Sequence, residues 1–350
     1  MTTDTPHITP STDHSPSTAE GEQYDALVIG GGPAGLSAAV SLGRSLRRVL
    51  IIDAGAPRNR FASHMHTVLG HEGIDPAELL RRGRQEALSY GADIISGRVT
   101  RLAEATGAGP ASMVAALEDG RTVFGRVVIA AAGLADQLPE IPGLAERWGR
   151  SVLHCPYCHG WEVRGQRIGV LATSPFALHH AELLRQWTDR ITFFSAGAGE
   201  LSEETAARLS SRGVRIEPVE VTEVEGAGDA LSGVILADGR HVPVDALFTL
   251  GAPRPHDGFL AGFELDRTPS PMGDVLAVDA TGRTSHPRIW AAGNVASPAA
   301  NVVVSMSGGT MAGAGANMAL VTEDFDLAQQ TAQQQGAALD GTPGALASRT

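Results

Sequence analysis

The chain has 350 residues, of which 43% are hydrophobic and 19% charged, and it contains 42 glycines. This composition is typical of a soluble α/β protein with room for two domains, and it argues against a fibrous or disordered one. The net charge of −12 argues against nucleic acid or an anionic membrane as the main partner, because both bind basic faces. The sequence has no apolar run long enough to span a membrane, so we expect a cytoplasmic protein.

The two ends of the chain differ in composition from the rest. Residues 1–22 are polar and rich in Ser, Thr and Pro, without the basic start and apolar run of a secretory signal. Residues 326–350 are rich in Ala, Gln and Gly. We predict a disordered N-terminal tail and a flexible C-terminal tail.

The first half of the chain predicts a βαβ unit followed by further strands. Hydrophobic periodicity gives a strand, a glycine turn, a helix and a second buried strand within residues 24–53. A helix with Asp75 as its cap and Pro76 at its first position follows. The expected elements are a helix at 76–90, strands at 93–102, 113–117 and 122–131, and a connection between domains at 134–148.

The second half repeats the alternation of strands and helices. Strands are expected at 167–172, 190–194, 214–224, 231–236, 246–250 and 288–293, with helices at 176–187 and from 305 to about 321. Alternating β and α elements predict an α/β fold with parallel sheets.

Three glycines, Gly30, Gly32 and Gly35, have the G-x-G-x-x-G spacing between the first strand and the first helix. Gly30 permits the tight turn, Gly32 lets the backbone approach a pyrophosphate, and Gly35 lets the helix pack on the strand. Asp53 ends the second strand, where a carboxylate can accept hydrogen bonds from ribose. We therefore predict a dinucleotide site; the alternative is a structural glycine turn. The motif alone does not choose between FAD and NAD.

Cys155 and Cys158, separated by two residues, are the only cysteines of the chain. They lie in the segment His154-Cys155-Pro156-Tyr157-Cys158-His159-Gly160. In a cytoplasmic chain this spacing favours a redox-active pair. The alternatives are a zinc site, which would crowd four ligands into six consecutive residues, and a structural pair. His159 is a candidate general base, with a simple turn residue as the alternative, whereas His154 is interpreted as a turn residue.

A third motif, Ala291-Ala292-Gly293-Asn294-Val295, completes a pattern that resembles the low-molecular-weight thioredoxin reductase family over residues 24–323. The resemblance implies two Rossmann-like, three-layer nucleotide-binding domains, a homodimer and FAD as cofactor. The FAD domain would comprise residues 23–135 and 253–325, and residues 136–252 would form the second domain, which carries the cysteine pair. Cys158 would lie beside the flavin, and Cys155 would exchange with substrate. Asn294 stands where the family usually has Asp, and we expect FAD to be retained. The implied FAD-binding residues are Gly30, Gly32, Pro33, Ala34, Gly35, Asp53, Gly293, Asn294 and Val295, with Val302 and Val303 near the isoalloxazine ring.

The second domain departs from the family's NADPH-binding pattern. The expected glycine turn is replaced by Ala172-Thr-Ser-Pro-Phe-Ala177, and the expected basic stretch by the uncharged residues 193–199. Anion recognition without these groups is difficult, so we predict a degenerate NADPH site.

The cysteine motif also resembles one subgroup, the dithiol oxidases that close the disulfides of gliotoxin and holomycin. The C-P-[YF]-C-H-G pattern matches residues 155–160, and the segment 53–59 is similar. This similarity implies that Arg58 and Asn59 also bind FAD. The resemblance implies an FAD-dependent oxidase of a small-molecule dithiol, with molecular oxygen as acceptor and hydrogen peroxide as product. The alternatives are a thioredoxin reductase-like enzyme fed by NADPH or ferredoxin, a redox sensor, and a zinc module. His64, Met65 and His66 are candidate pocket residues or exposed loop residues.

Overall fold

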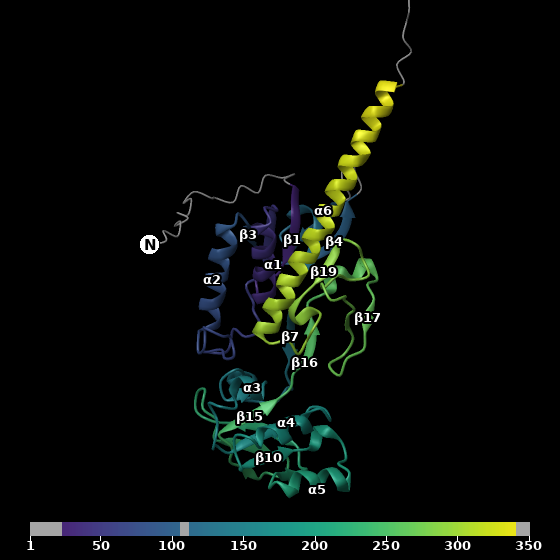
Figure 1. The fold of residues 1–350 in the computed structure, drawn as a ribbon. Helices are drawn as coiled ribbons and strands as arrows, with labels where there is room; N and C mark the ends of the chain where they lie inside the picture. The colour runs from purple at the N-terminus through teal and green to yellow at the C-terminus, as the bar shows by residue number, and fades with distance from the viewer. Residues whose placement is uncertain (1–22, 106–111, 341–350) are drawn as a thin grey trace, which may run out of the picture.

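The computed structural model describes residues 23–105 and 112–340, which form two α/β domains joined by a pair of strands (Figure 1). The predicted tail at 1–22 and the end of the chain beyond 340 lie outside the described residues. The α/β class expected from the sequence is confirmed. None of the helices in the described part of the chain is long and apolar enough to cross a membrane.

The first domain is built on a seven-stranded sheet in the order β3-β2-β1-β6-β5-β4, with β19 paired to β6. Strands β3, β2, β1, β6 and β19 run parallel, whereas β4, β5 and β6 pair antiparallel. Helices α1, α2 and α6 and four short elements complete the domain. The bounds are β1 (Gln23–Ile29), α1 (Pro33–Arg44), β2 (Val49–Asp53), α2 (Pro76–Ser89), β3 (Asp93–Ser96), β4 (Val99–Ala105), β5 (Ser112–Leu117), β6 (Thr122–Ala130), η3 (Gly258–Phe263), β17 (Arg267–Thr268), β18 (Val275–Leu276), β19 (Ile289–Ala291), η4 (Gly293–Val295) and α6 (Val302–Asp340).

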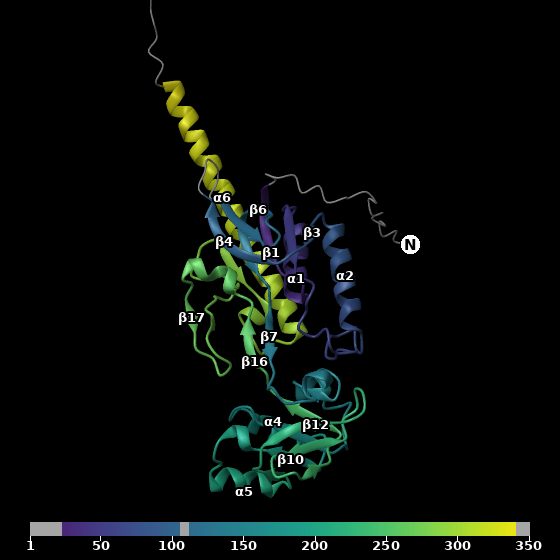
Figure 2. The ribbon, with the colours of Figure 1, turned by 180° about the vertical axis from the view of Figure 1, so that it is seen from behind.

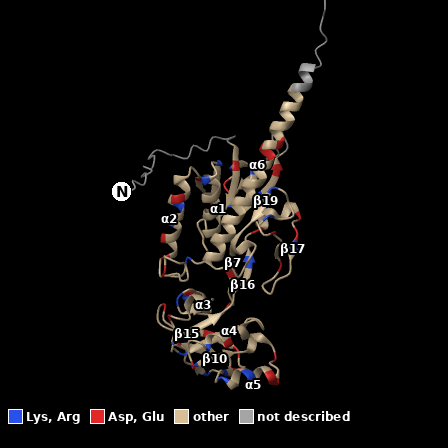
Figure 3. Cartoon of the chain, in the orientation of Figure 1, with Lys and Arg blue, Asp and Glu red and all other residues tan. Residues whose placement is uncertain are grey.

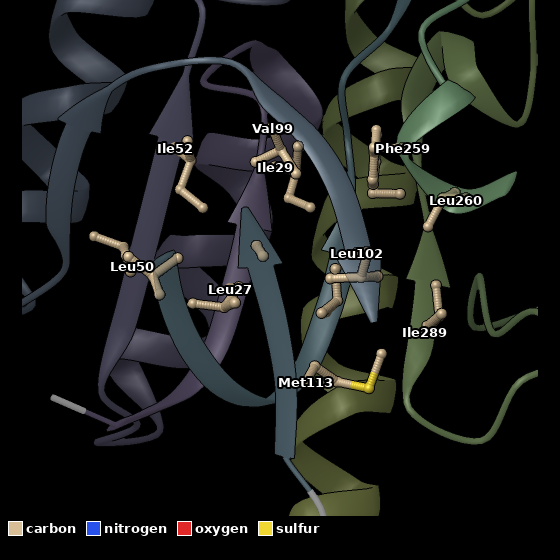
Figure 4. Packing of buried hydrophobic residues seen from close by; sticks show 14 of the residues in the cluster. Leu27, Ile29, Leu50, Ile52, Val99, Leu102, Met113, Phe259, Leu260 and Ile289 are labelled. Atoms are coloured by element: carbon tan, nitrogen blue, oxygen red, sulfur yellow. The ribbon is translucent and has the colours of Figure 1, made fainter. Parts of the chain in front are cut away.

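Side chains alternate along β1 between the two faces of this sheet, as the period of a strand requires. Ala26 and Val28 pack in the cluster formed with α1, α2 and α6. Leu27 and Ile29 pack in the opposite cluster with Leu102 and other residues of β4 and β5 (Figure 4). Both faces of the sheet are therefore covered at β1. A site can form only where the strand ends, and the glycine turn follows its carboxyl end.

The second domain contains a five-stranded parallel sheet in the order β11-β10-β9-β15-β8. Helices α4 and α5 cover one face, and the antiparallel strands β12, β13 and β14 cover the other (Figure 2). The bounds are η1 (Ala145–Arg147), β8 (Val152–Leu153), α3 (Pro156–His159), β9 (Ile168–Leu171), α4 (Ala177–Leu184), β10 (Ile191–Phe194), η2 (Ala196–Ala198), α5 (Glu203–Ser211), β11 (Arg215–Glu217), β12 (Val221–Glu225), β13 (Gly233–Leu236), β14 (His241–Val242) and β15 (Ala246–Thr249).

The two domains are connected by the antiparallel strands β7 (Leu134–Gln137) and β16 (Ala252–Pro255). The predicted boundaries, 135/136 and 252/253, fall inside these two strands. The exact division of the chain into domains stays a prediction.

Two strands predicted as continuous are split in the structure. The expected strand 93–102 divides at Gly97 into β3 and β4, which belong to opposite ends of the sheet order. The expected strand 214–224 divides at Pro218 into β11 and β12, because proline lacks the N–H that a ladder needs. Helix α5 was not predicted, although Ser202 followed by two glutamates is a usual helix start, and the Ser202 hydroxyl does accept from the backbone N–H of Thr205.

The C-terminal helix is longer than predicted. It was expected to end near Val321 and to be followed by a flexible tail from Asp326, but α6 continues to Asp340. Glu323 and Asp324 hold this part of the helix to the first domain through ion pairs with Arg126, Arg288 and Arg47. Beyond Asp324 the helix projects from the domain, and its Ala and Gln residues favour helix (Figure 1). The tail predicted to begin at Asp326 is thus helical as far as Asp340.

Candidate functional site

A cavity of about 660 Å³ is lined by residues of both domains. This volume is in the range of cofactor and small-molecule sites. Both the glycine turn after β1 and the cysteine pair of the second domain belong to its wall. The predicted residues that line it are Gly30, Gly32, Pro33, Ala34, Asp53, Arg58, Asn59, His64, Met65, His66, His154, Cys155, Cys158, His159, Gly293, Asn294 and Val302.

The glycine turn is tight at two positions and open at the third. Gly30 has φ of +113°, and a Cβ there would lie 2.3 Å from the carbonyl oxygen of Ala131. A Cβ on Gly35 would lie 1.9 Å from the carbonyl oxygen of Gly30, so the helix and the strand touch at this point. A Cβ on Gly32 would meet nothing within 4 Å, and Gly32 caps α1 at the cavity. The turn therefore offers an open helix N-terminus, which is suited to a pyrophosphate.

Asp53 supports this turn from the end of β2. Its Oδ1 accepts from the backbone N–H groups of Gly31 and Gly55, each at 3.1 Å. Its other oxygen pairs with Arg84 of α2. Sequence reasoning missed Arg84, because its spacing from the glycine motif matches no pattern. Asp53 lines the cavity with its carboxylate already held by three donors.

Asn294 organises the turn that follows η4. Its Nδ2 donates to the carbonyl oxygens of Ser297 (3.1 Å), Pro298 (3.2 Å) and Ala300 (2.9 Å). A carboxylate could not donate these bonds. The replacement of the family's usual Asp therefore has a structural role in this chain, and it leaves Oδ1 as an acceptor.

Three of the predicted residues do not line the cavity. Gly35 lies beneath the turn, as its contact with Gly30 requires. Val295 is fully buried in the core, so any contact with a cofactor would come from its backbone. Val303 is 42% exposed and lies beside Val302, which does line the cavity.

The cysteine pair lies at the start of the short helix α3, with Cys155 as its N-cap. Both cysteines are free, half-buried and part of the cavity wall. The Cys158 thiol donates to the sulfur of Cys155, with 2.8 Å between the Sγ atoms. The two sulfurs are thus adjacent and placed for reversible disulfide formation.

The two thiols differ in acidity. The pKa of Cys155 is lowered to about 7, chiefly by the hydrogen bond from Cys158, with help from the backbone N–H groups of Cys158 and Tyr157 and from the charge of Arg58. The pKa of Cys158 is raised by the same hydrogen bond and by burial. In the reduced pair the thiolate therefore forms on Cys155, which makes it the better nucleophile and the better leaving group.

Two histidines beside the pair are held neutral. Burial lowers the pKa of His159, although the nearby carboxylate of Glu162 opposes this effect. Burial and the charge of Arg58 lower the pKa of His154 to about 4. A neutral imidazole can accept a proton, so His159 is competent as a base at neutral pH. Within residues 23–105 and 112–340, no cluster of three or more His, Cys, Asp and Glu side chains could hold a metal ion.

Comparison with known proteins gives the family. The family described as pyridine nucleotide-disulphide oxidoreductase matches residues 24–335. The chain belongs to this family.

Three known proteins are similar to this chain over most of their length. "Thioredoxin reductase sirT" from Leptosphaeria maculans is 34% identical over 86% of this chain and 96% of its own. The crystal structure of HlmI is 41% identical, with a TM-score of 0.84 over 89% of this chain and 96% of its own. An oxidoreductase from Agrobacterium tumefaciens is 39% identical, with a TM-score of 0.79 over 86% of this chain and 99% of its own.

FAD is the cofactor of this family member, which is an oxidoreductase of the thioredoxin reductase type. The residues that line the cavity fit FAD. The open position at Gly32 and the N-terminus of α1 suit its pyrophosphate, and the same cavity reaches both cysteines. When bound, FAD can accept two electrons from a dithiol.

Alkylation of Cys155 is expected to follow a titration near neutral pH. In the reduced flavoprotein, the rate with iodoacetamide should rise with pH through about 7 and then level off, because the thiolate is the reactive form. Cys158 should react only at higher pH, since its pKa is raised. The measurement is the rate at each cysteine, followed by peptide mass spectrometry. A midpoint for Cys155 near the ordinary thiol value of about 8.5 would contradict this assignment.

Replacing Asn294 with aspartate is expected to loosen the turn at residues 297–300. The variant loses three donated hydrogen bonds and places a carboxylate against three carbonyl oxygens. We expect a loss of about 2 kcal/mol in the free energy of unfolding, seen as a Tm lower by roughly 5 °C. Asn317→Asp, at a helical position outside the cavity, is the control, because the Asn317 side chain accepts from Arg47 at 2.8 Å and a carboxylate can still accept this bond. An Asn294→Asp protein as stable as wild type would show that these hydrogen bonds do not contribute to the stability of the protein.

Proposed function

We propose that the chain is an FAD-dependent dithiol oxidase that forms an intramolecular disulfide in a small-molecule, natural-product dithiol, with molecular oxygen as acceptor and hydrogen peroxide as product. The observation that carries the proposal is the single cavity whose wall includes the glycine turn, Cys155 and Cys158. A cofactor bound at the glycine turn and a thiol substrate bound at the cysteine pair would therefore lie in the same cavity.

The cysteine pair would perform the exchange. A substrate thiolate, formed as His159 accepts its proton, attacks Sγ of Cys155 in the Cys155–Cys158 disulfide and displaces the Cys158 thiolate. The second substrate thiolate then attacks the substrate sulfur of this mixed disulfide, so that the cyclic disulfide leaves and Cys155 departs as a thiolate. The low pKa of Cys155 favours that departure. FAD, held at the turn of Gly30 and Gly32, would supply the two-electron acceptor for the reduced cysteine pair, with molecular oxygen as the final acceptor.

The residues proposed to hold FAD surround the glycine turn and η4. We assign Gly30, Gly32, Pro33, Ala34, Gly35 and Asp53 to its nucleotide part, and Gly293, Asn294, Val295, Val302 and Val303 to the remainder. Asn59 lines the same cavity. Arg58 was also predicted to bind FAD, but its guanidinium is engaged by protein groups.

The second domain supports an enzyme that does not use NADPH. Open α/β sheets bind nucleotides at the carboxyl ends of their strands. In this chain a Cβ on Gly197 would lie 2.0 Å from the carbonyl oxygen of Ala172, so the backbone after β10 packs directly on the end of β9. Pro175 occupies the turn before α4, where a phosphate-binding glycine would be needed.

The alternative is a disulfide reductase fed by NADPH or ferredoxin. The names of two relatives favour it: sirT, and "Thioredoxin reductase tcpT" from Claviceps purpurea, which is 31% identical over 85% of this chain. Consumption of NADPH with a disulfide acceptor would identify this activity.

The proposal also includes a cytoplasmic homodimer. Four exposed apolar residues recur every seven residues along α6: Val304, Met311, Met318 and Phe325. The first three lie on residues 302–322, which carry no charged side chain (Figure 3). A stripe with this spacing suits packing against a second helix.

The test is stoichiometry in air with dithiothreitol as the probe. The oxidase consumes one O₂ and releases one H₂O₂ for each disulfide formed, without NADPH. An oxygen electrode measures the O₂ consumed, a peroxide assay measures the H₂O₂ released, and the residual thiol gives the amount of disulfide formed. No dithiol-dependent oxygen uptake, together with NADPH-dependent thiol formation, would overturn the proposal in favour of the reductase.

A further inference from the structure

Arg58 connects three segments of the chain around the cavity. Its Nε and one terminal nitrogen donate to the two carboxylate oxygens of Asp136 on β7, at 2.7 and 2.6 Å. Its other terminal nitrogen donates to the carbonyl oxygen of Pro298 at 2.9 Å. The ion pair is buried, with 19% of the Arg58 side chain and 5% of the Asp136 side chain exposed. A bidentate pair of this kind fixes geometry as well as charge.

The same guanidinium reaches the residue before the cysteine pair. One terminal nitrogen of Arg58 lies 3.5 Å from Nε2 of His154. The His154 ring is packed edge-on between Trp148 and His180, with centroids at 6.3 and 6.5 Å. His154 therefore has little freedom, and Cys155 follows it directly in the chain.

Further contacts from the loop after β2 reach the second domain. Arg150 donates to the hydroxyl of Ser63 at 2.8 Å. A Cβ on Gly149 would lie 2.7 Å from Cβ of Phe61, so the two backbones pass close together. Nε2 of His66 lies 3.5 Å from the carboxylate of Glu162. Of these contacts, the one at Arg58 is the most buried and the nearest to the cysteines in the chain.

We propose that Arg58 is a positioning residue, which holds the segment of the cysteine pair against the cavity by joining the loop after β2, β7 and His154. Its importance for turnover rests on the proposed function, but its effect on the position of Cys155 does not. Without Arg58, Asp136 loses its bidentate partner and His154 loses a neighbour, so the cysteine segment should move more freely and expose its thiol.

The test measures access to Cys155 in a Cys158→Ser background, where a single thiol reacts and no disulfide forms. Alkylation with iodoacetamide is followed over pH, because the alkaline plateau of the rate reports access to the sulfur, while the midpoint reports its charge environment. Arg58→Met removes both bonds and charge. Arg58→Lys keeps the charge but cannot make the bidentate pair. Arg82→Met, at an exposed position that pairs with Glu78 on α2, is the matched control.

We expect the plateau rate to rise at least five-fold in both Arg58 variants and to stay within two-fold of the parent in Arg82→Met. The midpoint should move upward in Arg58→Met and less in Arg58→Lys. If Arg58→Met does not fold, the double variant Arg58→Met/Asp136→Leu, which leaves no orphaned buried carboxylate, provides the same comparison. A plateau within two-fold of the parent in the folded Arg58 variants would overturn the proposal. This result is independent of whether a dithiol reduces the wild-type flavin.

Discussion

Replacing Cys155 with serine is expected to reduce dithiol oxidation by about 10³-fold or more, because no disulfide can form without both sulfurs. Cys158→Ser should lose turnover to the same extent. The two variants should differ in one respect. In Cys158→Ser the remaining Cys155 thiolate can attack an added disulfide, release one of its sulfurs as a thiolate and be trapped as a mixed disulfide, whereas Cys155→Ser lacks the thiol that we propose exchanges with substrate. Oxygen uptake measures turnover, and intact mass measures the trapped adduct.

Both cysteine variants should remain yellow, because the glycine turn that we assign to FAD belongs to the other domain. Loss of the flavin from both would contradict the assignment of separate roles to the two motifs. Oxidation that survives in either variant would place the chemistry elsewhere.

Gly35→Ala is expected to disrupt the first domain, and Gly32→Ala to spare it while weakening FAD binding. The added Cβ would lie 1.9 Å from the backbone oxygen of Gly30 in the first variant, whereas it would meet nothing within 4 Å in the second. We expect Gly35→Ala to cost about 3 kcal/mol of unfolding free energy, because backbone must move. Gly32→Ala, with φ of −80°, should change stability by less than about 1 kcal/mol.

The two glycine variants are each other's control. Thermal melting of the flavin-free proteins measures the stability lost in Gly35→Ala, and titration with FAD measures the affinity of Gly32→Ala. We expect Gly32→Ala to lose about ten-fold or more in affinity for FAD, because its methyl group enters the cavity. Wild-type FAD affinity in Gly32→Ala would show that the pyrophosphate does not approach this turn. A Gly35→Ala protein as stable as wild type would contradict the tight contact.

The glycine turn and the cysteine pair could be located from the sequence because each is a local pattern. The turn needs a positive φ at Gly30 and a close contact at Gly35, and both favour glycine. Two cysteines separated by two residues can bring their sulfurs together within a single helical turn. The family resemblance added Asn294 and Val302 at positions the motif alone does not reach. Each of these predictions depended on residues close together in the chain.

The contacts that surround these motifs could not be predicted in the same way. Arg58 and Asp136 are 78 residues apart, and the pairing of Asp53 with Arg84 depends on how α2 packs. The acidity difference between the cysteines depends on burial and on a hydrogen bond whose direction the sequence does not specify. Hydrophobic periodicity also underestimated α6, because Glu323 and Asp324 are held by ion pairs rather than by an apolar face, and the helix beyond them projects from the domain.

The central claim is that electrons enter this flavoprotein from a dithiol and not from NADPH. The direct measurement is flavin absorbance near ~450 nm under anaerobic conditions, with dithiothreitol added to one sample and NADPH to another. The account predicts that the dithiol bleaches the flavin, that NADPH does not, and that air restores the colour and yields peroxide. Prompt bleaching by NADPH would contradict it and would identify the chain as a reductase.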